Sequence, residues 1–309
     1  MTRRPLLIDT DTASDDAVAL LMALRHPDVD VRAVTVVAGN VPLGQAVQNA
    51  LYASELAGAN VPVYAGAQKP RSRELHTGQA VHGDDGMGDI GLDLAGRTPA
   101  TGEAAQVLAD EIRARPGEVT LVTLGPLTNV ARAFELAPDA AQQLGSLVLM
   151  GGTSDHRGNI TAVAEYNIWA DPEAAALVFE SGAPITMVGW DISRKRAVIT
   201  PRDAEELRAL GPLGAFSVDI QRTLIEFCRE QTLLEGYDLP DPIAMAIALD
   251  PDVATEVRRL HVAVETIGEL TRGETVVDYR GIAQLPNADV VLDASRERFM
   301  ALLRDALGG

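Results

Sequence analysis

Four aspartates, Asp9, Asp11, Asp15 and Asp16, lie within eight residues near the start of the chain. A local structural role explains only the second pair, because Asp15 and Asp16 fit the first turn of a helix, whose free N–H groups favour negative charge. Asp9 and Asp11 follow a short apolar run, which we interpret as a buried strand. A hard cation would offset the repulsion among the four, and oxygen ligands favour Ca²⁺ or Mg²⁺ over zinc. The cluster therefore predicts a divalent-metal site that serves hydrolysis.

The elements that must position this cluster alternate between apolar strands and helices. Strands are expected at 6–8, 31–38, 61–64, 119–124, 146–150, 185–188, 259–265, 275–279 and 289–292. Helices are expected at 15–26, 43–57, 103–115, 127–136, 171–181, 201–210, 212–234, 242–249 and 295–307. Ser14 is the expected N-cap of the first helix. The segment 71–102 has no clear period and reads as a long loop, a kind of segment that is commonly functional.

Repeated strand–helix units predict right-handed crossovers and a mostly parallel central sheet flanked by helices, an α/β fold of the Rossmann-like kind. We expect a single domain over residues 1–309, because no linker or internal repeat interrupts the pattern. Ligands of such sheets bind outside the carboxyl ends of the strands. That rule selects residues 9–16, 39–40, 125–126, 151–152 and 190–191.

The composition limits the partners of the protein. The chain of 309 residues has a formal net charge of −18, and its only lysines are Lys69 and Lys195, so a nucleic acid partner is not expected. Cys228 is the single cysteine, which excludes an intramolecular disulfide. The start lacks the apolar core of a signal peptide, and no run of about 18 apolar residues follows, so we expect a cytoplasmic protein without a membrane partner.

Further motifs extend the pattern along most of the chain. They are Val37-Ala38-Gly39-Asn40-Val41, Val81-His82-Gly83-Asp84-Asp85-Gly86, Leu124-Gly125-Pro126-Leu127-Thr128-Asn129, Met150-Gly151-Gly152, Gly158-Asn159-Ile160, Ala164-Glu165-Tyr166-Asn167, Asp171-Pro172-Glu173-Ala174-Ala175, Asp241-Pro242 and Thr271-Arg272-Gly273. Together with the aspartate cluster, this ordered set resembles the inosine-uridine preferring nucleoside hydrolase family. That family typically opens with a strand followed by Asp-Thr-Asp-Pro-Gly-x-Asp-Asp, and here Thr12 and Ala13 replace Pro-Gly.

The resemblance implies the nucleoside hydrolase fold and calcium-dependent hydrolysis of the N-glycosidic bond of a ribonucleoside, which releases ribose and free base. It also implies a homo-oligomer, either a dimer or a tetramer. Carried over position by position, the implied Ca²⁺ ligands are Asp11, Asp16, Asp241 and the backbone carbonyl of Leu124. Asp11 would also take the proton of the attacking water, and Asp9 would be structural.

The resemblance assigns the substrate to a second set of residues. Asp15 would contact the ribose 2′-hydroxyl and the water, Asn40 and Asn167 the ribose hydroxyls, Asn159 and Glu165 the 5′-hydroxyl end, and His82 the region of the base. Taken alone, several of these residues have ordinary interpretations. The asparagines fit turns and loops, His82 fits a surface loop, and Asp241 fits a helix cap. Trp169 and Trp190 are expected in the core rather than against a base.

The chain departs from the family at Pro240, which directly precedes Asp241. Many members have a histidine there that protonates the leaving base, and others have a tryptophan. General-acid help is commonly worth roughly two to four orders of magnitude, and proline cannot supply it. Three hypotheses follow. Another group (His82, Tyr237 or Glu230) replaces the acid, or the substrate has a better leaving group, or the chain turns ribosides over poorly.

Two other functions stay open from the sequence. Asp9-x-Asp11 after a strand also resembles haloacid-dehalogenase-type phosphotransferases, but these need a well-placed lysine, for which Lys69 and Lys195 are poor candidates. A riboside-binding protein without leaving-group activation is the non-enzymatic alternative. Base preference cannot be read from the sequence.

Overall fold

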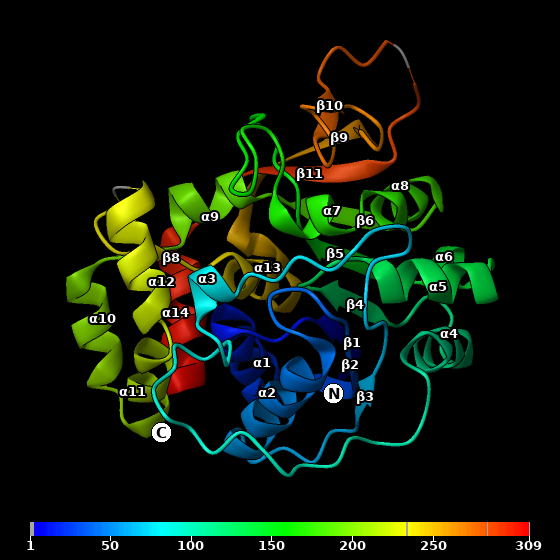
Figure 1. Cartoon of the computed structure of the whole chain (residues 1–309). Helices are drawn as coiled ribbons and strands as arrows, with labels where there is room; N and C mark the ends of the chain where they lie inside the picture. Colours follow the sequence, from blue (N-terminus) through cyan, green and yellow to red (C-terminus); the bar gives the residue numbers. More distant parts are fainter. Residues whose placement is uncertain (1–2, 233, 283, 309) are drawn as a thin grey trace.

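A nine-stranded sheet with helices on both faces forms the centre of the molecule (Figure 1). The protein is described here by a computed structural model that covers residues 3–232, 234–282 and 284–308. Within those residues the sheet has the strand order β10-β9-β11-β6-β5-β4-β1-β2-β3, and β7 pairs with β8 in a separate two-stranded sheet. The pairs from β11 to β3 are parallel, whereas β9 runs antiparallel to both β10 and β11. The predicted mostly parallel α/β fold is confirmed.

The boundaries of the elements follow the predicted alternation. The strands are β1 (Arg4–Thr10), β2 (Val29–Val36), β3 (Val63–Ala65), β4 (Thr120–Thr123), β5 (Ser146–Met150), β6 (Ile185–Val188), β7 (Val198–Ile199), β8 (Tyr237–Asp238), β9 (Ala254–Val264), β10 (Thr275–Asp278) and β11 (Ala288–Ala294). The helices are α1 (Ser14–Arg25), α2 (Leu43–Leu56), α3 (Gln79–His82), α4 (Ala104–Ala114), α5 (Thr128–Leu136), α6 (Ala140–Gln143), α7 (Tyr166–Ala170), α8 (Pro172–Glu180), α9 (Trp190–Arg196), α10 (Pro201–Arg208), α11 (Pro212–Asp219), α12 (Arg222–Phe227), the π-helix η1 (Cys228–Thr232), α13 (Pro240–Leu249), the 3₁₀ helix η2 (Pro251–Val253) and α14 (Arg296–Leu307).

Strand β1 shows why the sheet is buried on both faces. Successive side chains of a strand point to opposite sides. Leu6 and Ile8 therefore belong to one apolar layer, with α1, α2, α13 and α14, whereas Leu7 belongs to the other, with α4, α5 and α8. A continuous apolar run is what a strand covered on both faces requires.

Three local predictions are wrong. The helix expected at 212–234 is divided into α11, α12 and η1, and its predicted end includes position 233, which lies outside the described residues. The long loop 71–102 contains the short helix α3. Ser14 is not the N-cap of α1, because Ala13 occupies that position and the Ser14 hydroxyl bonds His82 instead.

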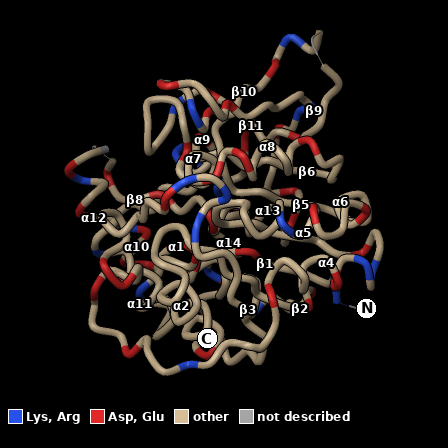
Figure 2. Tube along the Cα trace, turned by 45° about the vertical axis from the view of Figure 1, so that its right-hand side comes forward, with Lys and Arg blue, Asp and Glu red and all other residues tan. Residues whose placement is uncertain are grey.

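Acidic and basic residues are interspersed over the molecule, as Figure 2 shows, although acidic residues are more numerous. Within the described ranges, we find no helix that is both long enough and apolar enough to span a bilayer.

Candidate active site

The carboxyl ends of β1, β2, β4 and β5 open into a cavity of about 530 Å³. Its lining combines predicted site residues with others that the sequence did not single out. It consists of Asp15, Asn40, Thr77, Gly78, Ala80, Val81, His82, Leu124, Met150, Gly158, Asn159, Ile160, Glu165, Tyr166, Asn167, Trp190, Leu224, Phe227, Cys228, Gln231, Asp238, Pro240 and Asp241. A second hollow of about 710 Å³ lies over α5, α6 and α8, away from the strand ends, and holds none of the predicted site residues.

Asp9 is held by hydrogen bonds beside the end of β1. It is the next-to-last residue of β1 and fully buried, and its Oδ1 accepts hydrogen bonds from Thr35 Oγ1 at 2.6 Å and Asn129 Nδ2 at 2.8 Å. Burial raises the pKa of this carboxyl to about 7, against the effect of the two hydrogen bonds. These contacts fit the supporting role expected for Asp9.

Asp11 lies in a narrow space between two backbone turns. A Cβ atom on Gly39 would lie 2.0 Å from Asp11 Oδ2, and one on Gly125 would lie 2.7 Å from Oδ1. Oδ2 accepts the backbone N–H of Asn40 at 2.6 Å, whereas Oδ1 is buried and has no hydrogen-bond partner among the described residues. Burial, followed by the negative charge of Asp16, raises the pKa of Asp11. One oxygen is thus fixed and the other is available to a ligand.

Asp15, Asp16 and Asp241 form the tightest acidic group of the site. Each offers a carboxylate oxygen within 4.8 Å of the other two, and all three residues are buried. Asp16 is fixed by Thr10 Oγ1 at 2.5 Å and by the backbone N–H of Ala13 at 2.9 Å. Asp11 is not in this group, although its charge adds to those of Asp16 and Asp15 in raising the pKa of Asp241 after burial.

The donor set fits a hard divalent cation. Burial raises the pKa of all four carboxylates, and the charges of neighbouring aspartates raise it further, from within the cluster for Asp11, Asp16 and Asp241 and from Asp238 for Asp15. So much negative charge in one buried region is unfavourable without positive charge. Asp15 Oδ1 is a second buried oxygen without a hydrogen-bond partner in the described part of the chain. Carboxylate oxygens prefer Ca²⁺ or Mg²⁺ over softer ions.

Leu124, Asn167 and Glu165 are linked at one wall of the cavity. The backbone carbonyl of Leu124 accepts the Asn167 side-chain amide at 2.8 Å. Glu165 caps α7, since its carboxylate accepts the N–H groups of Asn167 at 2.9 Å and Ile168 at 3.3 Å. It also accepts the N–H of Gly152 at 2.8 Å. Burial raises the pKa of Glu165 to about 7, while these hydrogen bonds act to lower it.

The other predicted substrate residues also reach the cavity. Asn40 follows β2 and is half-buried, and Asn159 is exposed, with its Oδ1 accepting the backbone N–H of Tyr166 at 2.9 Å. His82 ends α3, and its Nδ1 lies 2.9 Å from Ser14 Oγ and 3.8 Å from Asp15 Oδ1. Burial lowers the pKa of His82 to about 4, so its ring is neutral near pH 7.

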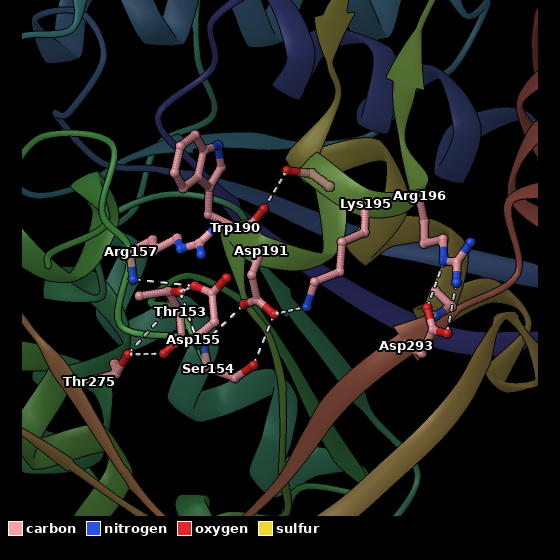
Figure 3. Close-up of polar contacts among 12 residues, drawn as sticks. Thr153, Ser154, Asp155, Arg157, Trp190, Asp191, Lys195, Arg196, Thr275 and Asp293 are labelled. Atoms are coloured by element: carbon pink, nitrogen blue, oxygen red, sulfur yellow. Dashed lines mark hydrogen bonds and ion pairs between the residues drawn. The ribbon is translucent and has the colours of Figure 1, made fainter. Parts of the chain in front are cut away.

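The loop after β5 is held in place by polar contacts with α9 and β10, as Figure 3 shows. Asp191 accepts the backbone N–H and the hydroxyl of Ser154, both at 2.9 Å, and its Oδ2 also accepts Lys195 Nζ at 3.1 Å. Thr275 Oγ1 accepts the N–H of Thr153 at 2.9 Å and donates to its carbonyl at 2.8 Å. These contacts anchor the loop whose further part brings Asn159 to the cavity.

Most residues of the cavity wall formed by α9, β8 and the start of α13 were not predicted from the sequence. Trp190 is half-buried against the core, as expected, but it also lines the cavity. Asp238 in β8 is buried there with its Oδ2 bonded to Ser193 Oγ at 2.7 Å. The strand-end rule did select Trp190, whereas nothing in the sequence marked Asp238. Pro240 lines the cavity directly before Asp241. Of the proposed substitutes for the missing acid, only His82 is among the described residues of the lining.

Comparisons with known proteins agree with this geometry. The family described as inosine-uridine preferring nucleoside hydrolase matches residues 6–301. The chain is 38% identical over 307 residues to the pyrimidine-specific ribonucleoside hydrolase RihA of Citrobacter koseri, covering 98% of this chain and 97% of the relative. It is similar to a plant nucleoside hydrolase structure, with a TM-score of 0.91, 33% identity and 99% of each chain covered. A purine-preferring ribonucleoside hydrolase from Gardnerella vaginalis gives a TM-score of 0.91, 31% identity and 98% of each chain.

Proposed function

The chain belongs to the inosine-uridine preferring nucleoside hydrolase family and is an enzyme that hydrolyses ribonucleosides to ribose and free base, and we propose that it does so with calcium bound to the aspartate cluster. The observation that carries the proposal is the meeting of four buried aspartates at the strand ends, two of them with an unpartnered oxygen. The ligands proposed are Asp11, Asp16, Asp241 and the carbonyl of Leu124. That carbonyl also accepts Asn167, and its second lone pair is open to a cation.

Asp11 is proposed as the base that takes a proton from the attacking water. Its Oδ2 is fixed by the Asn40 N–H, and its Oδ1, which lies beside Gly125, has no hydrogen-bond partner among the described residues. A bound calcium ion would supply positive charge that lowers the pKa of that water. The remaining carboxylates favour the positive charge that develops on the sugar when the C1′–N bond breaks.

The ribose is proposed to lie between Asp15, Asn40 and Asn167, which reach the cavity from three different elements. Asn159 and Glu165 lie beside them and would bind the 5′-hydroxyl end. Glu165 also acts through the backbone, because it holds the N–H groups of Gly152 and Asn167 in place. His82 would contact the base, from the side of α3.

Several wider expectations stay proposals of the same kind. One continuous sheet supports a single domain over residues 1–309. The homo-oligomer, dimer or tetramer, and the cytoplasmic location rest on the family resemblance.

The test is release of reducing sugar from inosine, uridine, cytidine, adenosine, guanosine and p-nitrophenyl riboside in the presence of Ca²⁺. Hydrolysis should fall by at least about a thousandfold in Asp11→Ala, which removes the base and a metal ligand together. Asp84→Ala, an exposed aspartate beside α3, is the matched control and should retain activity. Bound Ca²⁺ without turnover of any riboside, or phosphatase activity, would refute the assignment.

A further inference from the structure

The lining of the whole cavity is acidic, and part of it is aromatic. The described residues of the lining include the carboxylates Asp15, Glu165, Asp238 and Asp241, and no lysine or arginine. A calcium ion on the aspartate cluster would offset the charge near Asp241. Asp238 lies on β8, three residues before Asp241, and its negative charge acts on Asp15. It is not part of the group of Asp15, Asp16 and Asp241 whose oxygens lie within 4.8 Å of one another, so the cation proposed for the cluster would not bind it directly. A negative group therefore faces the space left for the base.

Asp238 is held in place by α9. Its side chain is buried, and Oδ2 accepts the Ser193 hydroxyl at 2.7 Å. Burial raises the pKa of Asp238, whereas the hydrogen bond from Ser193 and the positive charge of Arg194 favour its ionised form. Arg194 itself is stacked on the Trp190 ring, 5.1 Å from its centre, and is not part of the lining.

Aromatic rings complete this wall. Trp190 begins α9 and Phe227 ends α12, and both line the cavity with Asp238. Helix α12 packs against α3 (Figure 1). The lining of the cavity includes both rings and His82. Aromatic faces together with a carboxylate are the groups that bind organic cations.

The same wall lacks the expected proton donor. A neutral purine or pyrimidine leaves as an anion unless it is protonated, and Pro240 has neither an acidic proton nor a backbone N–H. His82 is neutral near pH 7, with its pKa lowered to about 4, and its Nδ1 is bonded to Ser14. A base that already carries a positive charge at the glycosidic nitrogen would need no proton.

From these observations we infer that the enzyme hydrolyses ribosides of quaternary, positively charged aromatic bases, such as N-ribosyl pyridinium compounds. The inference rests on the proposed function of the sugar side. Water forms a bond to C1′ while the C1′–N bond breaks, and both electrons of that bond go to the ring nitrogen. The base leaves as a neutral pyridine, ribose is formed, and the proton of the water goes to Asp11. Asp238 binds the cation before the bond breaks.

The experiment compares leaving groups on the calcium-loaded wild-type enzyme. The substrates are nicotinamide riboside, uridine, inosine and p-nitrophenyl riboside, and ribose release gives kcat/KM for each. We expect nicotinamide riboside to exceed uridine and inosine by about 10²- to 10⁴-fold, the range that a missing general acid explains. Pro240→His should raise kcat/KM for uridine and inosine without raising it for nicotinamide riboside.

A charge-specific variant tests the role of Asp238. In Asp238→Asn, kcat/KM for nicotinamide riboside should fall about tenfold more than for p-nitrophenyl riboside, since only the former is a cation. Binding to the wild type gives a measurement that does not depend on the folding of a variant. The cation 1-methylnicotinamide should inhibit hydrolysis of p-nitrophenyl riboside at least about tenfold more strongly than neutral nicotinamide.

The outcomes separate the two proposals. Equal kcat/KM for uridine and nicotinamide riboside, or equal inhibition by the cation and the neutral compound, would overturn the inference. Hydrolysis of p-nitrophenyl riboside without hydrolysis of nicotinamide riboside would also overturn it and leave the proposed function intact. No hydrolysis of any riboside would refute the proposed function, and the inference with it.

Discussion

Replacing Glu165 by glutamine should remove a pH-dependent term from the stability of the protein. Glu165 is buried at the start of α7, where Oε1 accepts the Asn167 N–H at 2.9 Å and Oε2 accepts the Gly152 N–H at 2.8 Å. These hydrogen bonds do not offset the loss of water, so the pKa is raised from 4.5 to about 7. Glutamine has nearly the same shape and no charge.

The sign follows from proton binding. Between pH 4.5 and about 7 the folded protein keeps a proton on Glu165 that the unfolded chain has released. The free energy of unfolding therefore decreases as pH rises through this window, and the contribution of the proton, complete below pH 4.5, is lost above pH 7. A pKa change from 4.5 to about 7 corresponds to about 3 kcal/mol.

Urea unfolding at pH 5 and pH 8, in a chelator, measures this effect in the wild type and in Glu165→Gln. The difference in free energy of unfolding, wild type minus variant, should be about 2–3 kcal/mol smaller at pH 8 than at pH 5. Glutamine also leaves one N–H without an acceptor, which should cost about 1–3 kcal/mol at both pH values and so cancels. Glu180→Gln, at the exposed end of α8, is the control. An unchanged difference for Glu165→Gln would show that its carboxyl is not desolvated as described.

Three further predictions concern packing and the metal. Gly39→Ala should reduce hydrolysis at least about a hundredfold, because its Cβ would overlap Asp11 Oδ2. The control is Gly44→Ala, whose Cβ would have no atom within 4 Å and which should be active. Equal activity of the two variants would contradict the narrow space around Asp11. Adding Ca²⁺ after chelation should stabilise the folded protein by about 2.7 kcal/mol at a hundredfold excess over Kd, and the melting temperature should rise accordingly. Asp241→Asn should weaken this rise. No rise in the wild type would exclude a specific site. Phe299→Ala in α14, fully buried, should lower the free energy of unfolding by about 3–5 kcal/mol in a urea titration, and a loss below 1 kcal/mol would show that the helix is loosely packed.

The sugar side of the site was largely predictable from the sequence. Asp9, Asn40 and Leu124 lie at or just after the ends of neighbouring parallel strands, and the register of the sheet brings those ends together. The apolar runs that mark these strands are short or interrupted, but they alternate regularly with helical segments, and this alternation predicts the strands. The pairing of individual oxygens was not predictable. The sequence alone does not reveal that Ser14 bonds His82, or that Asp15 rather than Asp11 forms the close group with Asp16 and Asp241.

The base side was missed for a physical reason that also bears on specificity. Its residues lie on short elements outside the central sheet, in α3, α9, α12, η1 and β8, whose positions depend on tertiary packing rather than on periodicity. Asp238, for example, reaches the cavity only because β8 pairs with β7 and Ser193 fixes its carboxylate. Such elements can change without disturbing the register that builds the sugar side. One similar relative is named as pyrimidine-specific and another as purine-preferring. Independent variation of the base side and the sugar side would allow this difference. Substrate preference in this chain should therefore follow substitutions at Trp190, Asp238 and Pro240, while substitutions at Asp11 should abolish hydrolysis of every riboside alike.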